Sequence, residues 1–284
     1  MSYSDELEQR SIYIIREAAA RFKNIGVLIS MGKDSITMAY LIRLAFPKDA
    51  IPENIHFYHL DTGLKFQEMY EFRDKISNEW NLKIEPIQYE DYILSSSPAN
   101  TFDCCNKRKT LTLKRLIKEK KIDAIMTAIR RDEMAERGIE RVFSPRKDGN
   151  WEVMTEKTPS ESKEGDSPFN YLQDAELSGW NIFASDYGSE CDHLRVHPIL
   201  DWTERDVWDY VKLKNLPVSE LYFSVNGKRF RSLGCETCTH PINSEAKTID
   251  DIIEELKTTE IAERSGRSLD KEKIQMRLRS LGYL

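Results

Sequence analysis

Short apolar runs alternate with longer helical patterns through the first half of this chain, and that alternation limits the possible folds more than any other feature. The runs with the length of buried strands cover residues 25–29, 55–60, 82–87 and 122–129. Helical patterns lie between them at 36–46, 67–80 and 107–120. Strands that alternate with helices in this way favour a doubly wound, mostly parallel α/β sheet.

Polar segments directly follow three of these apolar runs. They are the loop 30–35, the turn formed by Asp61, Thr62 and Gly63, and the charged segment 130–133, which begins with Arg130 and Arg131. In a doubly wound sheet, ligands bind beyond the carboxyl ends of the strands. We therefore expect the three segments to meet at a single site.

The loop 30–35 has the composition of a phosphate-binding loop. Backbone N–H groups at the start of a helix attract phosphate, and a glycine such as Gly32 lets the backbone approach a ligand closely. Lys33 adds positive charge, and Asp34 could cap the helix or help hold Mg²⁺. The Walker A spacing is absent. The predicted phosphate-binding residues are Ser30, Gly32, Lys33, Asp34 and Ser35.

Composition places few limits on the partners. The 284 residues carry a formal net charge of −6, which argues mildly against broad coating of nucleic acid but leaves room for a local basic site such as 107–121. The start of the chain is polar and acidic, and no apolar run approaches a membrane span. We expect a cytoplasmic protein with no membrane partner.

The second half of the chain changes character. Residues 144–192 are rich in Pro, Ser and Glu and show little periodicity, which predicts a flexible insertion or lid. Helices are expected at 203–215, 249–260 and 271–281. We therefore expect an ATP-binding α/β domain over 1–200 that contains this insertion, and a C-terminal helical region over 201–284.

The loop 30–35 resembles the Ser-Gly-Gly-Lys-Asp-Ser loop of the PP-loop ATP pyrophosphatases, a superfamily that includes phosphoadenosine phosphosulfate reductases and has an adenine nucleotide alpha-hydrolase-like fold. Met31 departs from the usual glycine, and a side chain there would narrow the approach to phosphate. Longer segments resemble the small, catalytic subunit of bacterial ATP sulfurylase, over most of the chain. They are 59–74, 130–133, 140–144, 195–198, 201–204, 232–235 and 263–267.

The resemblance implies a reaction in which ATP and sulfate give adenosine 5′-phosphosulfate and pyrophosphate, by cleavage between the α- and β-phosphates. It also implies a separate GTPase subunit as partner. Lys33, Arg130 and Arg131 would be catalytic, with positioning and cation clamps doing most of the chemistry. The implied ATP-binding residues are Ser30, Gly32, Lys33, Asp34, Ser35, Asp61, Thr62, Gly63 and Arg267.

Four of the five cysteines form a pattern. Cys104 and Cys105 are adjacent, and Cys235 and Cys238 form a Cys-x-x-Cys pair. This resembles the pattern that binds a [4Fe-4S] cluster in adenylylsulfate reductases and in PP-loop proteins of DNA phosphorothioation. Zinc and unliganded thiols stay open as alternatives. Cys191 has no partner in the pattern.

Other functions remain open at this point. The cysteines and the basic segment 107–121 also suit an enzyme that activates a DNA backbone phosphate for sulfur insertion, with DNA or a sulfur-donor protein as partner. A thiol-dependent reductase is disfavoured because no cysteine follows Cys238. A non-catalytic metal-binding scaffold would not need Lys33.

Overall fold

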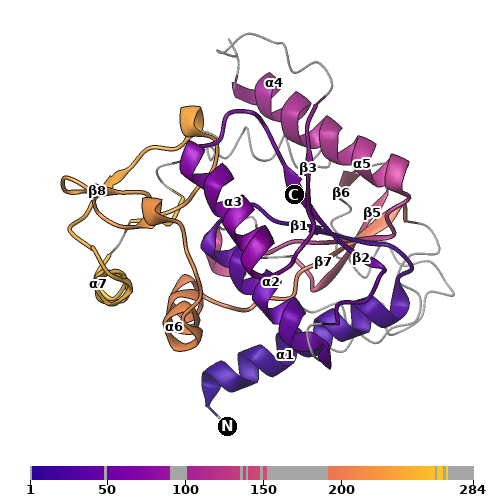
Figure 1. The fold of residues 1–284 in the computed structure, drawn as a ribbon, viewed down its shortest axis with the longest axis horizontal. Coiled ribbons are helices and arrows are strands. Elements are labelled where there is room, and N and C mark those ends of the chain that lie inside the picture. Colours follow the sequence, from indigo (N-terminus) through magenta and orange to yellow (C-terminus); the bar gives the residue numbers. More distant parts are fainter. Residues whose placement is uncertain are drawn as a thin grey trace, which may run out of the picture.

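The computed structural model describes residues 2–47, 50–89, 101–134, 137–138, 140–147, 150–151, 191–259, 261–264 and 267. Within these residues, the main sheet has seven strands in the order β3-β2-β1-β4-β7-β5-β6 (Figure 1). The first strand of the chain thus lies inside the sheet, with β2 on one side and β4 on the other. The crevice where strand order reverses therefore lies at the end of β1.

Five strands form the parallel part of the sheet: β1 (Ile25–Leu28), β2 (Ile55–Leu60), β3 (Ile84–Ile87), β4 (Ala124–Met126) and β7 (His193–Val196). Two antiparallel strands, β5 (Phe143–Lys147) and β6 (Asn150–Trp151), extend it beyond β7. Because β1 pairs in parallel with both neighbours, the carboxyl ends of β1, β2 and β4 share one edge.

Helices lie against the sheet and beyond it. They are α1 (Tyr3–Arg21), α2 (Lys33–Ala45), α3 (Gln67–Glu79), α4 (Thr101–Cys105), a π-helical segment (Asn106–Leu111), α5 (Thr112–Lys120), α6 (Glu204–Lys214) and α7 (Ile249–Glu255). Ser2, Thr203 and Thr248 begin α1, α6 and α7 with capping boxes, in which side chains satisfy otherwise unpaired N–H groups.

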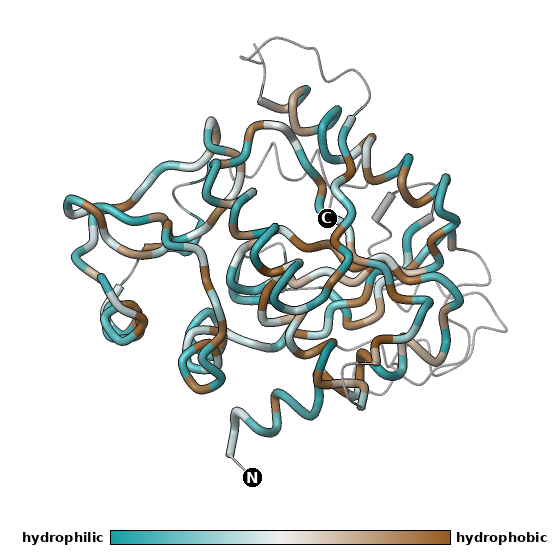
Figure 2. Tube along the Cα trace, viewed as in Figure 1, coloured by the Kyte–Doolittle hydropathy of each residue, from teal (hydrophilic) through white to brown (hydrophobic). Residues whose placement is uncertain are grey.

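Alternating side chains divide the core between the two faces of the sheet. Phe57 packs in a large cluster with residues of α1, α2, α3 and α6, whereas its neighbour Tyr58 packs in a smaller cluster with Leu113 and Leu116 of α5. Successive strand residues point to opposite faces, so α5 covers the face opposite α1 and α2. Figure 2 shows the apolar residues concentrated along the strands.

The C-terminal region forms a separate layer of structure beside the sheet. A short antiparallel pair, β8 (Lys228–Arg229) and β9 (Ile242–Asn243), lies with α6 and α7 at one side of the molecule (Figure 1). Two 3₁₀ turns, Glu220–Tyr222 and Glu236–Cys238, connect these elements. Tyr222 of the first turn contacts the start of α2 after β1, whereas Glu236 of the second turn contacts the segment after β2.

The predicted α/β class and mostly parallel sheet are confirmed. The sequence missed α4, β5 and β6, and the first residues of the expected insertion 144–192 belong to β5. Residues 152–190 and the expected helix 271–281 lie outside the described residues, so the domain division stays a prediction. Within the described part of the chain, no helix has the length and apolar character that a bilayer crossing requires.

Candidate active site

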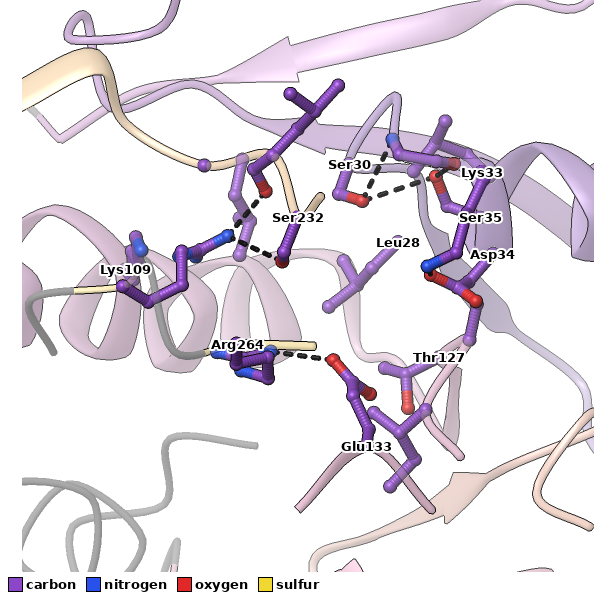
Figure 3. Close-up of a pocket in the computed structure, with 18 of the residues that line it drawn as sticks. Leu28, Ser30, Lys33, Asp34, Ser35, Lys109, Thr127, Glu133, Ser232 and Arg264 are labelled. Carbon is purple, nitrogen blue, oxygen red and sulfur yellow. Dashed lines mark hydrogen bonds and ion pairs between the residues drawn. The ribbon is translucent and has the colours of Figure 1, made fainter. Parts of the chain in front are cut away.

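A cavity opens at the carboxyl end of β1, where the fold places the crevice (Figure 3). The loop 30–35 forms one side, and in Figure 3 Lys109 and Arg264 face it from the other side. The polar and charged residues that line the cavity are Ser30, Lys33, Asp34, Ser35, Lys65, Lys109, Thr127, Glu133, Arg137, Tyr222, Ser232, Arg264 and Arg267.

The loop has an unusual backbone at Met31. This residue has φ of +67°, in the left-handed region that non-glycine residues seldom adopt. Its side chain is fully buried in the core and does not line the cavity. The expectation that Met31 narrows the approach to phosphate is therefore wrong, because the left-handed turn directs the side chain into the apolar core.

Tyr222 holds the start of α2. The backbone N–H of Lys33 donates to the Tyr222 hydroxyl at 2.9 Å, and the Ser35 hydroxyl donates to the carbonyl of Gly32 at 2.9 Å. Sequence reasoning missed Tyr222, because nothing near it in the chain resembles a ligand-binding motif. It lies 189 positions from Lys33, so only the fold brings it to the loop.

The charges of Lys33, Asp34, Arg130 and Glu263 form a closed ring. Lys33 Nζ lies 3.1 Å from the Asp34 carboxylate and also contacts Glu263. Arg130 contacts the same two carboxylates through Nη1 and Nη2. Each cation in the ring therefore pairs with both carboxylates. The side chains of Lys33, Arg130 and Glu263 are almost completely buried.

The ring fixes the ionisation of its members. Burial alone would lower the pKa of Lys33, but Asp34 and Glu263 outweigh it and raise that pKa. Burial opposes ionisation of Glu263 as well, yet Arg130 and Lys33 hold the pKa of its carboxyl below the ordinary value. Lys33, Arg130 and Glu263 are thus charged at neutral pH, and removing one partner would leave an uncompensated buried charge.

The other predicted site residues lie away from the lining of the cavity. Arg130 packs behind the loop, and Arg131 points to Asp201 at 2.8 Å. Asp61 accepts hydrogen bonds from Tyr70 and Gln88 at 2.8 and 2.7 Å. Thr62 and Gly63 also lie outside the lining. Binding or catalytic roles for these residues stay predictions, whereas Ser30, Gly32, Lys33, Asp34, Ser35 and Arg267 do line the cavity.

Cations outside the loop supply most of the remaining charge. Glu133 is buried between Arg137 and Arg264, with 2.7 Å to Arg264 Nη1. Burial lowers the pKa of Lys65 to about 8, and repulsion from Lys109 and Arg267 adds to this effect. From the sequence, Lys65 was expected only as a possible neighbour of the site and Lys109 only as part of the local basic site 107–121, and Arg137 was not named. The sequence features that could have identified such residues are a basic side chain shortly after a strand and a basic side chain in the helical segment 107–120.

Gly234 gives Arg267 its place. Arg267 Nη1 donates to the Leu233 carbonyl at 2.6 Å and to Ser232 Oγ at 3.2 Å. A Cβ on Gly234 would lie 2.5 Å from the guanidinium carbon of Arg267, which is closer than atoms can pack. The guanidinium therefore occupies the space that a side chain at position 234 would need, so a larger residue there would displace it.

The four patterned cysteines come from two distant parts of the chain and are buried free thiols. Burial raises the pKa of Cys104 above its ordinary value and raises the pKa of Cys105 to about 11. Burial opposes ionisation of Cys235 too, but Lys109 and Lys65 lower its pKa to about 7. Among the described residues, no group of three or more His, Cys, Asp or Glu side chains is arranged to hold a metal ion.

The comparison with protein families agrees with this geometry. Residues 24–241 match the phosphoadenosine phosphosulfate reductase domain, so the fold and the loop place the chain in that class of α/β proteins. Sulfate adenylyltransferase subunit 2 of Pseudomonas entomophila (strain L48) is 34% identical over 306 aligned positions, covering 95% of this chain and 93% of that protein. The chain belongs to the sulfate adenylyltransferase subunit 2 family.

Solved structures share the fold at low sequence identity. Phosphoadenylyl-sulfate reductase from Candida auris superposes with a TM-score of 0.53 at 14% identity, covering 84% of this chain and 98% of that chain. FMN adenylyltransferase from Candida glabrata gives 0.54 at 15% identity, covering 99% and 84%. At these identities the likeness concerns the fold alone.

Proposed function

We propose that this protein is the catalytic small subunit of a sulfate adenylyltransferase, which joins sulfate to the α-phosphate of ATP. A sulfate oxygen attacks the α-phosphorus, a new S–O–P linkage forms, and the bond from the α-phosphorus to the bridging oxygen breaks to release pyrophosphate. The observation that carries the proposal is the cavity itself. It has a phosphate-loop motif on one side, and basic side chains face that loop from the other.

The loop would hold the pyrophosphate part of ATP. The hydroxyls of Ser30 and Ser35 line the cavity beside the N-terminus of α2, where they can donate to phosphate oxygens. Sulfate and the α-phosphate both carry negative charge, so the basic side chains across the cavity would attract them. Lys109 and Arg267 are among the residues that line this side. Cations that are fixed before the reaction lower the energy of the charge that builds up in transfer. Arg130 and Arg131 would act by fixing Asp34 and Asp201.

The loop also suits magnesium. Mg²⁺ in nucleotide sites is bound through one or two carboxylates together with substrate phosphates. Asp34 lines the cavity and its side chain is 17% exposed, so its carboxylate can reach a phosphate-bound cation. Asp34 would hold the ion, and Mg²⁺ would supply positive charge that neutralises the leaving pyrophosphate.

The partner we propose is a separate GTPase subunit, working with this chain in the cytoplasm. Forming a phosphosulfate anhydride from ATP is unfavourable, so a second nucleotide hydrolysis is a chemically reasonable driving force. The relatives are named as a second subunit, which fits a larger assembly.

The cysteines would bind a [4Fe-4S] cluster through Cys104, Cys105, Cys235 and Cys238. Four thiols are the donor set that such clusters use, and the basic side chains near Cys235 favour its thiolate form. No catalytic step is assigned to the cluster. Thr62 Oγ1 lies 3.2 Å from Cys235 Sγ, which connects the turn after β2 to this proposed structural centre.

The decisive experiment combines the anaerobically purified chain with MgATP, sulfate and the proposed GTPase subunit. Pyrophosphate release that requires sulfate is expected, together with adenosine 5′-phosphosulfate. Release that ignores sulfate but rises with double-stranded DNA would favour activation of a DNA phosphate instead. Absence of pyrophosphate release in every combination would refute the adenylyltransferase.

A further inference from the structure

The cations behind the phosphate loop are already neutralised by protein carboxylates. Lys33 pairs with Asp34 and Glu263, and Arg130 pairs with both of these and with Asp132 at 2.9 Å. Three carboxylates therefore face two cations. The loop thus presents no surplus positive charge to a phosphate chain, although its motif contains a lysine.

Two backbone donors of the loop are engaged within the protein. The Lys33 N–H donates to Tyr222 at 2.9 Å, and the Gly32 N–H points to Ser30 Oγ at 3.4 Å. A metal-free pyrophosphate is a small, highly charged anion that needs compensating cations. At this loop the positive charge that balances pyrophosphate would have to arrive with the ligand, because protein carboxylates already neutralise Lys33 and Arg130.

Glu263 is the carboxylate of the ring that lies outside both the loop 30–35 and the lining of the cavity. It contacts both cations, and its side chain is 5% exposed. Asp34 pairs with the same two cations, but its side chain is 17% exposed and lines the cavity, where it is the proposed magnesium ligand. Glu263 therefore differs from Asp34 in that it contacts the cations and not the cavity.

We propose that Glu263 is a specificity-determining residue that makes the loop accept pyrophosphate as its magnesium complex rather than as the free anion. This inference rests on the proposed function, because it assumes that the loop binds the pyrophosphate part of ATP. Its basis is the closed ring of Lys33, Asp34, Arg130 and Glu263.

The test is calorimetric titration of the folded protein with inorganic pyrophosphate, once with excess Mg²⁺ and once with EDTA. We expect the wild-type protein to bind at least about tenfold more weakly in EDTA, and E263Q to regain about tenfold in EDTA while its affinity for the magnesium complex changes little. E255Q is the matched control. It removes the same charge from the ion pair with Arg229, which lies outside the cavity lining, so it should retain the wild-type preference.

E263D separates charge from packing, because it keeps the carboxylate on a shorter side chain and should keep the magnesium preference. Equal wild-type affinity with and without Mg²⁺ would overturn the inference, as would equal weakening of both forms in E263Q or loss of the preference in E263D. Binding of magnesium pyrophosphate without sulfate-dependent turnover would refute only the proposed reaction. Binding in neither condition would refute both.

Discussion

The ammonium of Lys33 donates a hydrogen bond to the carboxylate of Glu263, which lies 230 positions further along the chain. The contact connects the loop after the first strand to a segment near the other end of the protein. Glu263 also contacts Arg130, so one carboxylate from the C-terminal region organises both cations that the sequence motif nominates. The phosphate loop is therefore complete only in the folded whole.

Replacement of Lys33 tests the loop directly. In Lys33→Met, Glu263 and Asp34 lose one of their two buried cations, and pyrophosphate release should fall at least about 100-fold because the loop loses its fixed geometry. We also expect the free energy of unfolding to drop by about 3 kcal/mol, the usual cost of breaking a buried pair. Lys257→Met, at an exposed pair with Glu254, is the control. Turnover at the wild-type level would contradict the site.

Gly234→Ala tests the position of Arg267. The new methyl group would collide with the guanidinium, which is the movable end of a flexible side chain, so the side chain should shift while the fold remains. ATP affinity is expected to fall about tenfold, or ~1.4 kcal/mol, with little change in Tm. Glu236→Ala, an exposed change in the same loop, should leave affinity unaltered. A large drop in Tm for Gly234→Ala would mean that the backbone, and not Arg267, meets the methyl group.

The buried imidazole of His59 should make the stability of the fold depend on pH. Burial lowers the pKa of His59 from 6.5 to about 4, and its Nδ1 lies 2.8 Å from the Ile29 carbonyl. Because the unfolded chain binds the proton more readily, stability is full above pH 6.5 and falls as the pH drops towards 4. This histidine alone should cost about 2 kcal/mol between pH 7.5 and pH 5.

Urea unfolding at several pH values measures this effect. His193 and His197 act in the same direction, since burial lowers the pKa of each to about 3 and about 4. His59→Gln retains a donor for the Ile29 carbonyl but cannot titrate, so its unfolding free energy should vary less with pH. An unchanged pH slope in that variant would show that His59 is not held neutral.

Cys235 tests the proposed cluster. Anaerobically purified protein should contain iron and acid-labile sulfide, and its spectrum should show the visible absorption of a [4Fe-4S] centre. Cys235→Ser should lose most of the iron, whereas Cys191→Ser, outside the four-cysteine pattern, should retain it. Zinc in place of iron would identify the alternative site, and metal-free protein with intact turnover would assign the thiols a packing role.

The sequence predicted the sheet well because its signals are local. Apolar strands, helix starts and the loop 30–35 can each be recognised from neighbouring residues, and β1, β2 and β4 carry the polar segments at their ends as expected. The antiparallel strands β5 and β6 were missed because Pro and charged residues interrupt their apolar pattern. Arg146 of β5 is nevertheless buried, and its charge is met by Glu140 at 3.3 Å, a pairing that an apolar pattern does not reveal.

The site was predicted less completely, for a physical reason. Motif reading found Lys33 and Asp34 but treated Arg130 as a free cation, because the carboxylate of Glu263 could be placed beside it only in three dimensions. Tyr222 was missed in the same way. Pairings over long stretches of chain depend on the fold, and no local pattern encodes them.

The hydroxyl of Tyr222 and the carboxylate of Glu263 both reach the loop from late in the chain. During synthesis on the ribosome, the first strands and α2 emerge long before either residue does. In a growing polypeptide, the backbone N–H of Lys33 therefore lacks the Tyr222 hydroxyl, and the ammonium of Lys33 lacks the Glu263 carboxylate. The contacts that shape the start of α2 can therefore form only after the C-terminal segment has been made.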